Sequence, residues 1–352
     1  MDNMTKNKQM PDGQKSKIVV VGAGAIGSIV GGLLAKARED VTLIGRKTHV
    51  DVINRHGLII DGIMGEMKID ITAKESLDFE PDIVILSVKT QDVKTAAQEI
   101  KPYVSKSTII TMQNGVESDK ITADILGKEN IISCVVVFGG TFLEPGKVTF
   151  TNYNKKGSLV IGQAFGQESE QVERVAAILN KALPVAKVSN IHGAHWTKLI
   201  LNQVNAIPAV TGIPMQEVSK NRKLVKLQIL LTREGLRVIE KSGAKPCSLP
   251  GAPISIIKFM INLPLIFSLP LFAMQSKVLG SIPIPGSTLQ SIKRGRTTEI
   301  DYLNGEIINL GEKLGIPTPY NSAIVSLVHK IAKSKKFLSA DELIDIIFTD
   351  KK

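Results

Sequence analysis

The segment from Lys17 to Lys36 constrains the fold of this chain more than any other part of the sequence. It begins with an apolar, β-branched run at residues 17–21, which is typical of a parallel strand buried on both faces. The string Gly22-Ala23-Gly24-Ala25-Ile26-Gly27 follows, and residues 28–35 are small and apolar. We therefore expect a strand, a tight glycine-rich turn and a helix that packs closely on a sheet.

The three spaced glycines predict a dinucleotide site of the Rossmann type. Gly22 permits the tight turn, Gly24 leaves room for a pyrophosphate, and Gly27 lets the helix pack on the strand. Such a string alone is weak, but here a strand precedes it and a helix follows it. The residues expected to contact the cofactor are Gly22, Ala23, Gly24, Ala25, Ile26 and Gly27, mainly through backbone N–H groups at the helix N-terminus.

The end of the second expected strand, residues 41–44, favours NADP over NAD. An NAD site places an acidic residue there to bind the ribose hydroxyls, but this chain has Gly45, Arg46 and Lys47. Asp40 precedes the strand and is poorly placed. An arginine at this position can pair with a 2′-phosphate, so we predict that Arg46 contacts NADPH. The alternative is that Arg46 and Lys47 form a solvated, charged loop.

The alternation of strands and helices predicts an α/β fold in two parts. Strands expected near residues 83–88, 108–111 and 134–137, with a helix from about Val93, complete an N-terminal Rossmann-type doubly wound sheet. After about Asn190 the pattern is helical, notably at residues 195–207, 223–241 and 297–313. We predict a disordered tail at 1–16, an NADP-binding domain at 17–188 and a mainly α-helical substrate domain at 189–352. A single domain is the alternative.

Composition excludes several functional classes. The net charge of +11 suits nucleic acid, an anionic membrane or acidic small molecules, but the lysines are scattered and aromatic residues make up only 4%. We therefore expect a phosphate-bearing cofactor and a carboxylate substrate, and no nucleic acid. Cys134 and Cys247 stand far apart, and no metal-ligand spacing is present. The polar tail has no apolar core of signal-peptide length, so we expect a cytoplasmic protein without a metal.

Several motifs, in order, resemble those of the ketopantoate reductase family, the 2-dehydropantoate 2-reductases. They span about residues 17–330 and comprise Ser87-Val88-Lys89-Thr90, Gln113-Asn114-Gly115-Val116, His195-Trp196-Thr197-Lys198-Leu199-Ile200-Leu201-Asn202, Gly286-Ser287-Thr288-Leu289-Gln290, Arg296-Thr297-Thr298-Glu299-Ile300-Asp301-Tyr302-Leu303-Asn304-Gly305 and Gly315-Ile316-Pro317-Thr318-Pro319-Tyr320-Asn321. The resemblance implies reduction of 2-dehydropantoate to pantoate by NADPH, a step towards pantothenate and coenzyme A.

The same resemblance implies roles for individual residues. Lys198 would be the general acid, and Glu299 would be a polar anchor near the reacting centre that also contacts the cofactor. Lys89 and Asn114 would lie near the nicotinamide and the substrate. The substrate's polar groups would be held by Asn114, Asn202, Asn205 and Ser287.

A helical repeat places three of these residues together. At about 100° per residue, Asn202 lies about 40° from Lys198, and Asn205 lies about 20° away on the other side. A polar face on an otherwise apolar helix indicates a lined cleft; the alternative is an exposed polar stripe. The family spaces its two asparagines four apart, whereas here Ala206 occupies the expected place and Pro208 follows. Asn205 is expected to substitute.

Other polar residues have structural interpretations. Asp301 is expected to cap a helix or to be a favourable dipole partner at its start, and Ser287 has N-capping as its alternative role. Residues Ser339-Ala340-Asp341-Glu342 resemble a capping box that opens a short last helix. His192 and His195 are candidates for proton donation, but no carboxylate is evidently placed to orient either one. Packing or helix-terminus roles are therefore preferred for both histidines.

An apolar insertion at about 246–285 departs from the family pattern. Residues 252–274 are long enough to cross a bilayer, but Pro253, Pro264 and Pro270 divide them. We expect a broken helical hairpin that forms a subunit interface, a lid or a membrane-touching patch, in that order of preference, and we expect a homodimer. The insertion leaves open two alternatives: reduction of another 2-oxo acid, or a non-catalytic NADP-binding sensor or membrane-peripheral protein.

Overall fold

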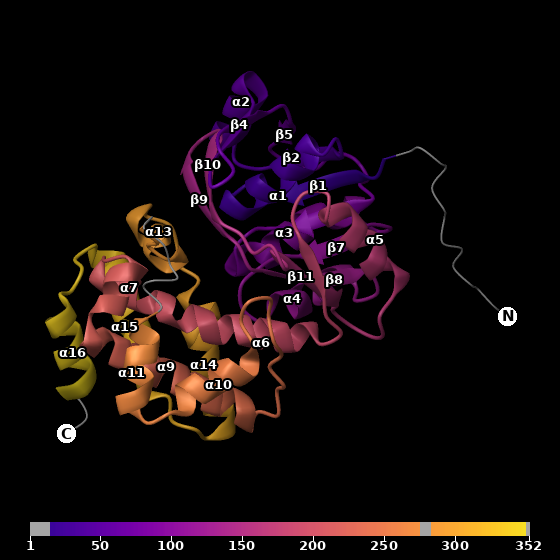
Figure 1. Cartoon of the computed structure of the whole chain (residues 1–352). Helices are drawn as coiled ribbons and strands as arrows, with labels where there is room; N and C mark the ends of the chain where they lie inside the picture. The colour runs from indigo at the N-terminus through magenta and orange to yellow at the C-terminus, as the bar shows by residue number, and fades with distance from the viewer. Residues whose placement is uncertain (1–14, 275–282, 350–352) are drawn as a thin grey trace.

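The computed structural model describes residues 15–274 and 283–349 and divides into an α/β half and a helical half (Figure 1). The tail predicted at 1–16 lies outside these residues except for its last two. The change of architecture falls between strand β12 (Val185–Lys187) and helix α6 (Ile191–Asn202). A mixed α/β fold with a helical C-terminal part is the fold class predicted from the sequence, while the domain boundary at 188 stays a prediction.

An eight-stranded sheet forms the centre of the α/β half. Its order is β12-β11-β8-β7-β6-β1-β2-β5, and all neighbours are parallel except β8 and β11. The strands not yet bounded are β1 (Lys17–Val21), β2 (Asp40–Ile44), β5 (Thr72–Lys74), β6 (Ile83–Leu86), β7 (Thr108–Thr111), β8 (Ile131–Val136) and β11 (Leu159–Gln163). The chain reverses its direction of winding between β1 and β6, which is where a doubly wound sheet opens a ligand crevice.

Helices cover both faces of this sheet. On one face, Ile18 and Val20 pack in a core with α1 (Ala25–Lys36) and α5 (Glu170–Leu179). On the other face, Val19 and Val21 pack with α3 (Val93–Ile100), and α4 (Ser118–Leu126) lies beside it. Alternate side chains of one buried strand therefore enter two cores, which accounts for its continuous apolar run. Helix α2 (Lys47–His56) follows β2.

A second, four-stranded sheet lies across α1 and was not predicted from the sequence. Its order is β4-β3-β10-β9, formed by β3 (Leu58–Gly62), β4 (Met67–Ile69), β9 (Gly139–Glu144) and β10 (Lys147–Asn152). A Cβ atom at Gly31 would lie 2.5 Å from Leu43 in the large sheet, and one at Gly32 would lie 2.7 Å from Ile60 in the small sheet. The two glycines thus let α1 fit between the sheets.

The helical half is built on α9 (Arg222–Lys241), which confirms the helix predicted at 223–241. The side chain of Asn221 caps it by accepting from the amides of Lys223 and Leu224. The remaining elements are η3 (Gln203–Asn205), α7 (Ala206–Thr211), α8 (Met215–Lys220), α10 (Ile254–Asn262), α11 (Leu265–Ala273), α13 (Ser287–Lys293), η4 (Ile300–Tyr302), α14 (Asn304–Leu314), α15 (Pro319–Ser334) and α16 (Ala340–Thr349).

Two helix predictions are wrong at their ends. The helix expected at 195–207 is interrupted by η3, because Pro208 has no amide hydrogen for the carbonyl of Val204 four residues earlier. The helix expected at 297–313 begins only at Asn304. By contrast, the capping box expected at Ser339 is present: its hydroxyl accepts from the amide of Glu342 at 3.2 Å, and the Glu342 carboxylate accepts from the Ser339 amide at 2.7 Å.

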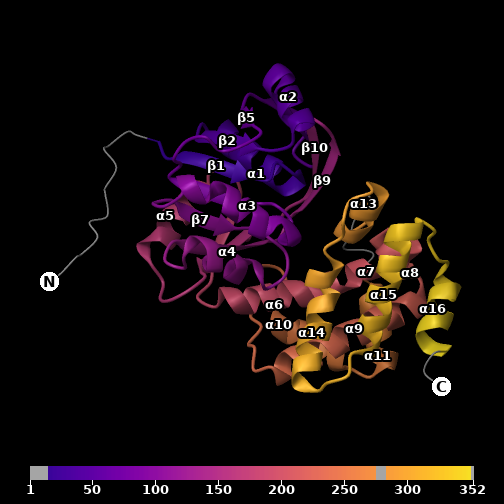
Figure 2. The ribbon, with the colours of Figure 1, turned by 180° about the vertical axis from the view of Figure 1, so that it is seen from behind.

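Residues 254–273 of the apolar insertion form two short helices, α10 and α11, that pack on α9, and residues 275–282 of the insertion lie outside the described residues. Prolines precede both helices, and Arg233 on α9 donates to the carbonyls of Ile261 and Leu263 at the break between them. Figures 1 and 2 place this hairpin on the side of the helical half remote from α1, which does not favour a lid over the glycine-rich turn. Within residues 15–274 and 283–349, no helix is both long and apolar enough to span a bilayer.

Candidate active site

The glycine-rich turn lies at the crevice between β1 and β6. Gly22 has a φ of +103°, and a Cβ atom there would lie 2.5 Å from the amide nitrogen of Val88, just after β6. A Cβ at Gly27 would overlap the carbonyl oxygen of Gly22. At Gly24, however, the nearest atom to an added Cβ would be 4.0 Å away. Packing within the protein therefore explains Gly22 and Gly27, whereas Gly24 borders open space that a ligand can enter.

Free amides face this space. The amides of Gly22 and Ala23 donate to the carbonyl of Ile44 at 3.0 and 2.9 Å, so they hold the turn on β2. Among the described residues, nothing accepts from the amides of Ala25, Ile26 and Gly27 in the first turn of α1, and that turn has no acidic residue and no side-chain cap. Unpaired amides at a helix N-terminus suit a phosphate group. The turn therefore fits a dinucleotide.

Glu299 crosses from the helical half to the crevice edge. Its carboxylate accepts from the backbone amide and the hydroxyl of Thr90, both at 3.2 Å. The same hydroxyl lies 2.8 Å from the backbone carbonyl of Asn114. These bonds hold residues 297–303 outside the helix that the sequence predicts there, which is why α14 starts late.

Lys89 also bridges the two halves. Its ammonium donates to the Ser291 hydroxyl at 2.9 Å and to the Thr297 carbonyl at 2.5 Å. Burial lowers its pKa, and Arg296 and Arg294 lower it further, although Glu299 and Asp92 act in the opposite direction. Ser291 lies one turn after Ser287, whose own side chain is exposed at the start of α13. Gly286, not Ser287, is the N-cap of this helix, so the capping role for Ser287 is wrong.

Three asparagine side chains form a hydrogen-bonded chain. The amide nitrogen of Asn202 donates to the side-chain oxygen of Asn114 at 3.1 Å, and that of Asn205 donates to the side-chain oxygen of Asn202 at 3.4 Å. The 3₁₀ turn at 203–205 changes the angle expected for a continuous helix, but Asn205 still reaches its neighbour. The structure thus brings together Asn114, Asn202 and Asn205 from both halves.

Lys198 lies one helical turn before Asn202 on α6. Its side chain is half-buried, and burial lowers its pKa from 10.5 to about 8. It makes no hydrogen bond or ion pair with any residue that the structure describes. A desolvated ammonium with free donors has the properties of a proton donor at neutral pH.

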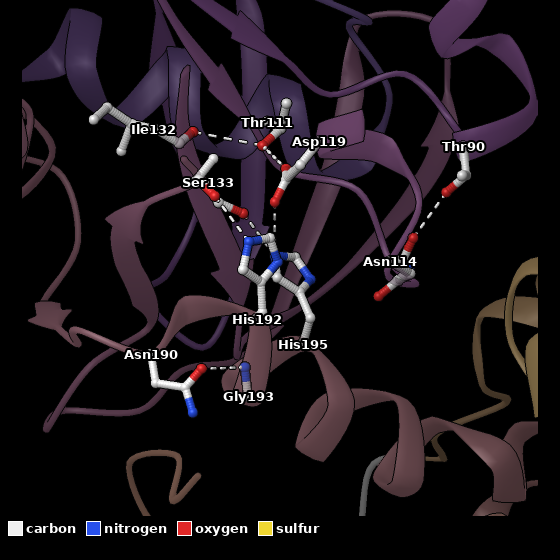
Figure 3. A network of polar contacts seen from close by, with 11 residues as sticks. Thr90, Thr111, Asn114, Asp119, Ile132, Ser133, Asn190, His192, Gly193 and His195 are labelled. Atoms are coloured by element: carbon white, nitrogen blue, oxygen red, sulfur yellow. Dashed lines mark hydrogen bonds and ion pairs between the residues drawn. The ribbon is translucent and has the colours of Figure 1, made fainter. Parts of the chain in front are cut away.

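His195 has a carboxylate partner that the sequence did not indicate. Its Nε2 atom lies 2.7 Å from the Ser133 hydroxyl and 3.9 Å from Asp119, whose other oxygen accepts from Thr111 at 2.5 Å (Figure 3). Burial lowers the pKa of His195 and outweighs the opposite effect of Asp119. These groups join α6 to the end of β7 and to the middle of β8. Asp119 lies 76 residues before His195 in the sequence, so no local spacing could reveal the pair.

Other predicted residues lie apart from this cluster. Arg46 is exposed at the start of α2, and its side chain has no bonded partner among the residues described. Lys47 beside it pairs with Asp51 at 3.4 Å and Glu75 at 3.6 Å, so it is less free to bind a phosphate. Asp301, expected as a cap or a dipole partner at a helix start, lies in the first turn of η4 and pairs with His329 at 2.8 Å.

Comparison with known proteins identifies the family. The family model described as "Ketopantoate reductase PanE/ApbA" matches residues 18–165. A second model, described as "Ketopantoate reductase PanE/ApbA C terminal", matches residues 190–332. A 2-dehydropantoate 2-reductase of Pyrococcus horikoshii is 32% identical over 315 residues, which cover 89% of this chain and 96% of that protein. The chain belongs to the ketopantoate reductase family. Another such enzyme, from Aquifex aeolicus, is 29% identical and covers 89% of this chain and 96% of its own.

Solved structures of the ketopantoate reductase family share the fold. The PanE/ApbA family ketopantoate reductase from Ralstonia eutropha JMP134 is 29% identical, has a TM-score of 0.74, and covers 90% of this chain and 99% of its own. D-mandelate dehydrogenase with NADH and anilino(oxo)acetate also has a TM-score of 0.74 with the same coverage, but at 22% identity it supports the fold alone. Family membership makes the chain an oxidoreductase that uses a nicotinamide dinucleotide.

Proposed function

We propose that this member of the ketopantoate reductase family reduces 2-dehydropantoate to pantoate with NADPH. The observation that carries the proposal is the chain of Asn114, Asn202 and Asn205, with Lys198 one turn away on the same helix. It lies next to Glu299, which is bonded to the loop after β6. Amides, an ammonium and a carboxylate provide donors and acceptors for the keto, carboxylate and hydroxyl groups of such a substrate.

When bound, a nicotinamide dinucleotide would supply the hydride for the ketone carbon. Negative charge then develops on the ketone oxygen, where a positive group gives the largest stabilisation. We assign that role to Lys198, whose ammonium transfers a proton to the oxygen. Its pKa of about 8 keeps it mostly protonated at neutral pH while making it a stronger acid than an ordinary lysine. The roles of Asn114, Asn202, Asn205 and Ser287 in holding the substrate are part of this proposal.

The cofactor preference in this proposal is for NADPH. It is supported by the exposed, unpaired Arg46 directly after β2 and by the absence of an acidic residue at 45–47. The amides of Ala25, Ile26 and Gly27 would hold the pyrophosphate, and Lys89 and Glu299 would lie on the nicotinamide side. Purified protein is expected to use NADPH in preference to NADH, and equal use of both would contradict this part.

The test of the substrate is a rate comparison. With NADPH as reductant, 2-dehydropantoate is expected to give a higher kcat/KM than a panel of branched 2-oxo acids, measured as the loss of NADPH absorbance. A higher kcat/KM for another 2-oxo acid would make that acid the assigned substrate, and the assignment of the protein as a reductase would stand. Turnover of none of them would contradict the enzymatic proposal.

We further propose a cytoplasmic homodimer. Six apolar side chains on α10, on α11 and directly after α11 are exposed. They are Ile256, Phe259, Ile266, Phe267, Leu271 and Met274. A patch of this kind usually marks an interface. Light scattering of the purified protein is expected to give twice the chain mass, and a Phe259→Glu, Phe267→Glu variant is expected to give the mass of one chain. The free thiols of Cys134 and Cys247 suit a reducing compartment, which fractionation would test.

A further inference from the structure

Two arginines of the helical half converge on an aromatic ring of the α/β half. The guanidinium carbon of Arg296 lies 5.4 Å from the ring centroid of Phe142 on β9, and that of Arg294 lies 5.9 Å from it. Arg294 is the residue after α13, and Arg296 follows in the loop that leads to Glu299. Neither the arginines nor the ring has a part in the proposed substrate reduction. Their convergence therefore needs its own explanation.

Within the part of the chain that the structure describes, the positive charges of Arg294, Arg296 and Arg46 have no carboxylate partner. Burial lowers the pKa of both Arg294 and Arg296; Arg296 lowers that of Arg294 further, and Arg46 does the same to Arg296. Like charges this close repel one another, and a bound anion would convert that repulsion into attraction.

Phe142 and its strand β9 also lie beside α1, the helix that follows the glycine-rich turn. The ring of His49 lies 4.8 Å from that of Phe142, and its Nε2 atom lies 3.2 Å from the Ser28 hydroxyl on α1. Along β9, a Cβ atom at Gly140 would contact Ala25, which begins α1. Phe142 therefore lies between α1, whose first turn has the free amides, and the guanidinium groups of Arg294 and Arg296.

We propose that Arg294 and Arg296 join Arg46 in binding the 2′-phosphate of the cofactor, so that both halves of the protein determine the preference for NADPH. This inference rests on the proposed function, because it requires a 2′-phosphorylated dinucleotide. Three guanidinium groups supply enough fixed donors to surround a phosphate dianion, and the Phe142 ring holds two of them in place. The phosphate would thereby anchor the loop that carries Glu299.

The test uses two small probes, adenosine 2′,5′-bisphosphate and adenosine 5′-monophosphate, which differ only by the 2′-phosphate. Calorimetry on the full-length chain gives a dissociation constant for each probe, and their ratio measures recognition of that phosphate. Loss of one charge-assisted contact is expected to lower the ratio at least about tenfold in Arg294→Ala and in Arg296→Ala, as in Arg46→Ala. Affinity for the monophosphate is expected to stay within about twofold.

Lys293→Ala is the matched control. Lys293 is exposed and adjacent to Arg294, but it is not among the charges that act on Lys89, Arg294 or Arg296. This variant is expected to keep the wild-type ratio. Arg296→Gln provides a second variant that keeps a polar side chain of similar length, and its thermal midpoint shows that the protein is folded.

The possible results distinguish the role of Arg294 and Arg296 from the proposed preference for NADPH. If the ratio of the two dissociation constants falls in Arg46→Ala but stays at its wild-type value in Arg294→Ala and Arg296→Ala, the preference for NADPH stands and the inference is overturned. If the unmodified protein binds both probes equally, the preference itself is wrong and the inference falls with it. A loss in Lys293→Ala equal to that in the arginine variants would reduce the effect to general charge, which also overturns the inference.

Discussion

Replacing Lys198 by methionine should make the protein more stable and nearly inactive. Burial lowers the pKa of Lys198 from 10.5 to about 8, so the folded state holds this ammonium at a cost. The shift corresponds to at most about 3 kcal/mol, because each pKa unit is worth about 1.4 kcal/mol. Methionine has a similar length and no charge, and it removes that cost. The same change removes the proposed general acid, so kcat should fall about 10²- to 10⁴-fold.

The stability difference between Lys198→Met and the wild type should change with pH. Below pH 8 the lysine is protonated in both folded and unfolded chains, so the full cost is present. Between pH 8 and 10.5 the folded chain loses the proton first, and the wild-type protein gains stability relative to the variant. The advantage of Lys198→Met should therefore be largest at neutral pH and fall to zero near pH 10.5. The wild-type kcat/KM should decline above pH 8 as the ammonium is lost.

Urea unfolding at pH 7, 9 and 10.5, with kcat measured at pH 7, tests both effects. Lys120→Met is the control, because Lys120 is exposed on α4 and should change neither quantity. Our reasoning would be refuted if Lys198→Met were less stable than the wild type at pH 7, or if its advantage persisted at pH 10.5. Retention of kcat within about tenfold would refute the assignment of the acid.

The remaining predictions concern the turn and the substrate cleft. Gly24→Ala should unfold within about 1 kcal/mol of the wild type but bind NADPH at least about tenfold more weakly, because its Cβ would meet only the ligand. Gly27→Ala should lose about 1–3 kcal/mol of stability as well, since its Cβ would overlap the Gly22 carbonyl; equal stability of the two variants in urea would contradict this. Asn202→Ala leaves two side chains without partners and should raise the KM for the 2-oxo acid about tenfold, while calorimetry shows unchanged NADPH affinity. Glu299→Ala should lower kcat and also loosen residues 297–303, detected as faster amide exchange at Tyr302 and Leu303.

The sequence predicted those parts of the fold that depend on neighbours in the chain. The glycine-rich turn, α9 and the capping box at Ser339 each involve residues within a few positions of one another. The small sheet could not be predicted in this way, because β3 pairs with β10 across about ninety residues. Likewise, the late start of α14 depends on Thr90, which is 209 residues from Glu299.

In the candidate active site, too, some residues could be grouped from the sequence and others could not. Lys198, Asn202 and Asn205 lie close in sequence, so a helical repeat was enough to group them. The contact between Asn202 and Asn114, the carboxylate beside His195, and the two arginines over Phe142 join separate elements. Only the packing of the two halves reveals these residues.

The three linked asparagines have a direction, and it bears on how a substrate can lie. Asn205 donates to Asn202 and Asn202 donates to Asn114, so the side-chain nitrogen of Asn114 and the side-chain oxygen of Asn205 are the groups left at the two ends. One end of the row can therefore donate and the other can accept. Keto and carboxylate oxygens only accept, whereas the hydroxyl at the far end of 2-dehydropantoate can donate. At the Asn205 end a hydroxyl can donate to the side-chain oxygen, which a keto or carboxylate oxygen cannot do. Under the proposed function, the row would therefore favour one orientation of the substrate.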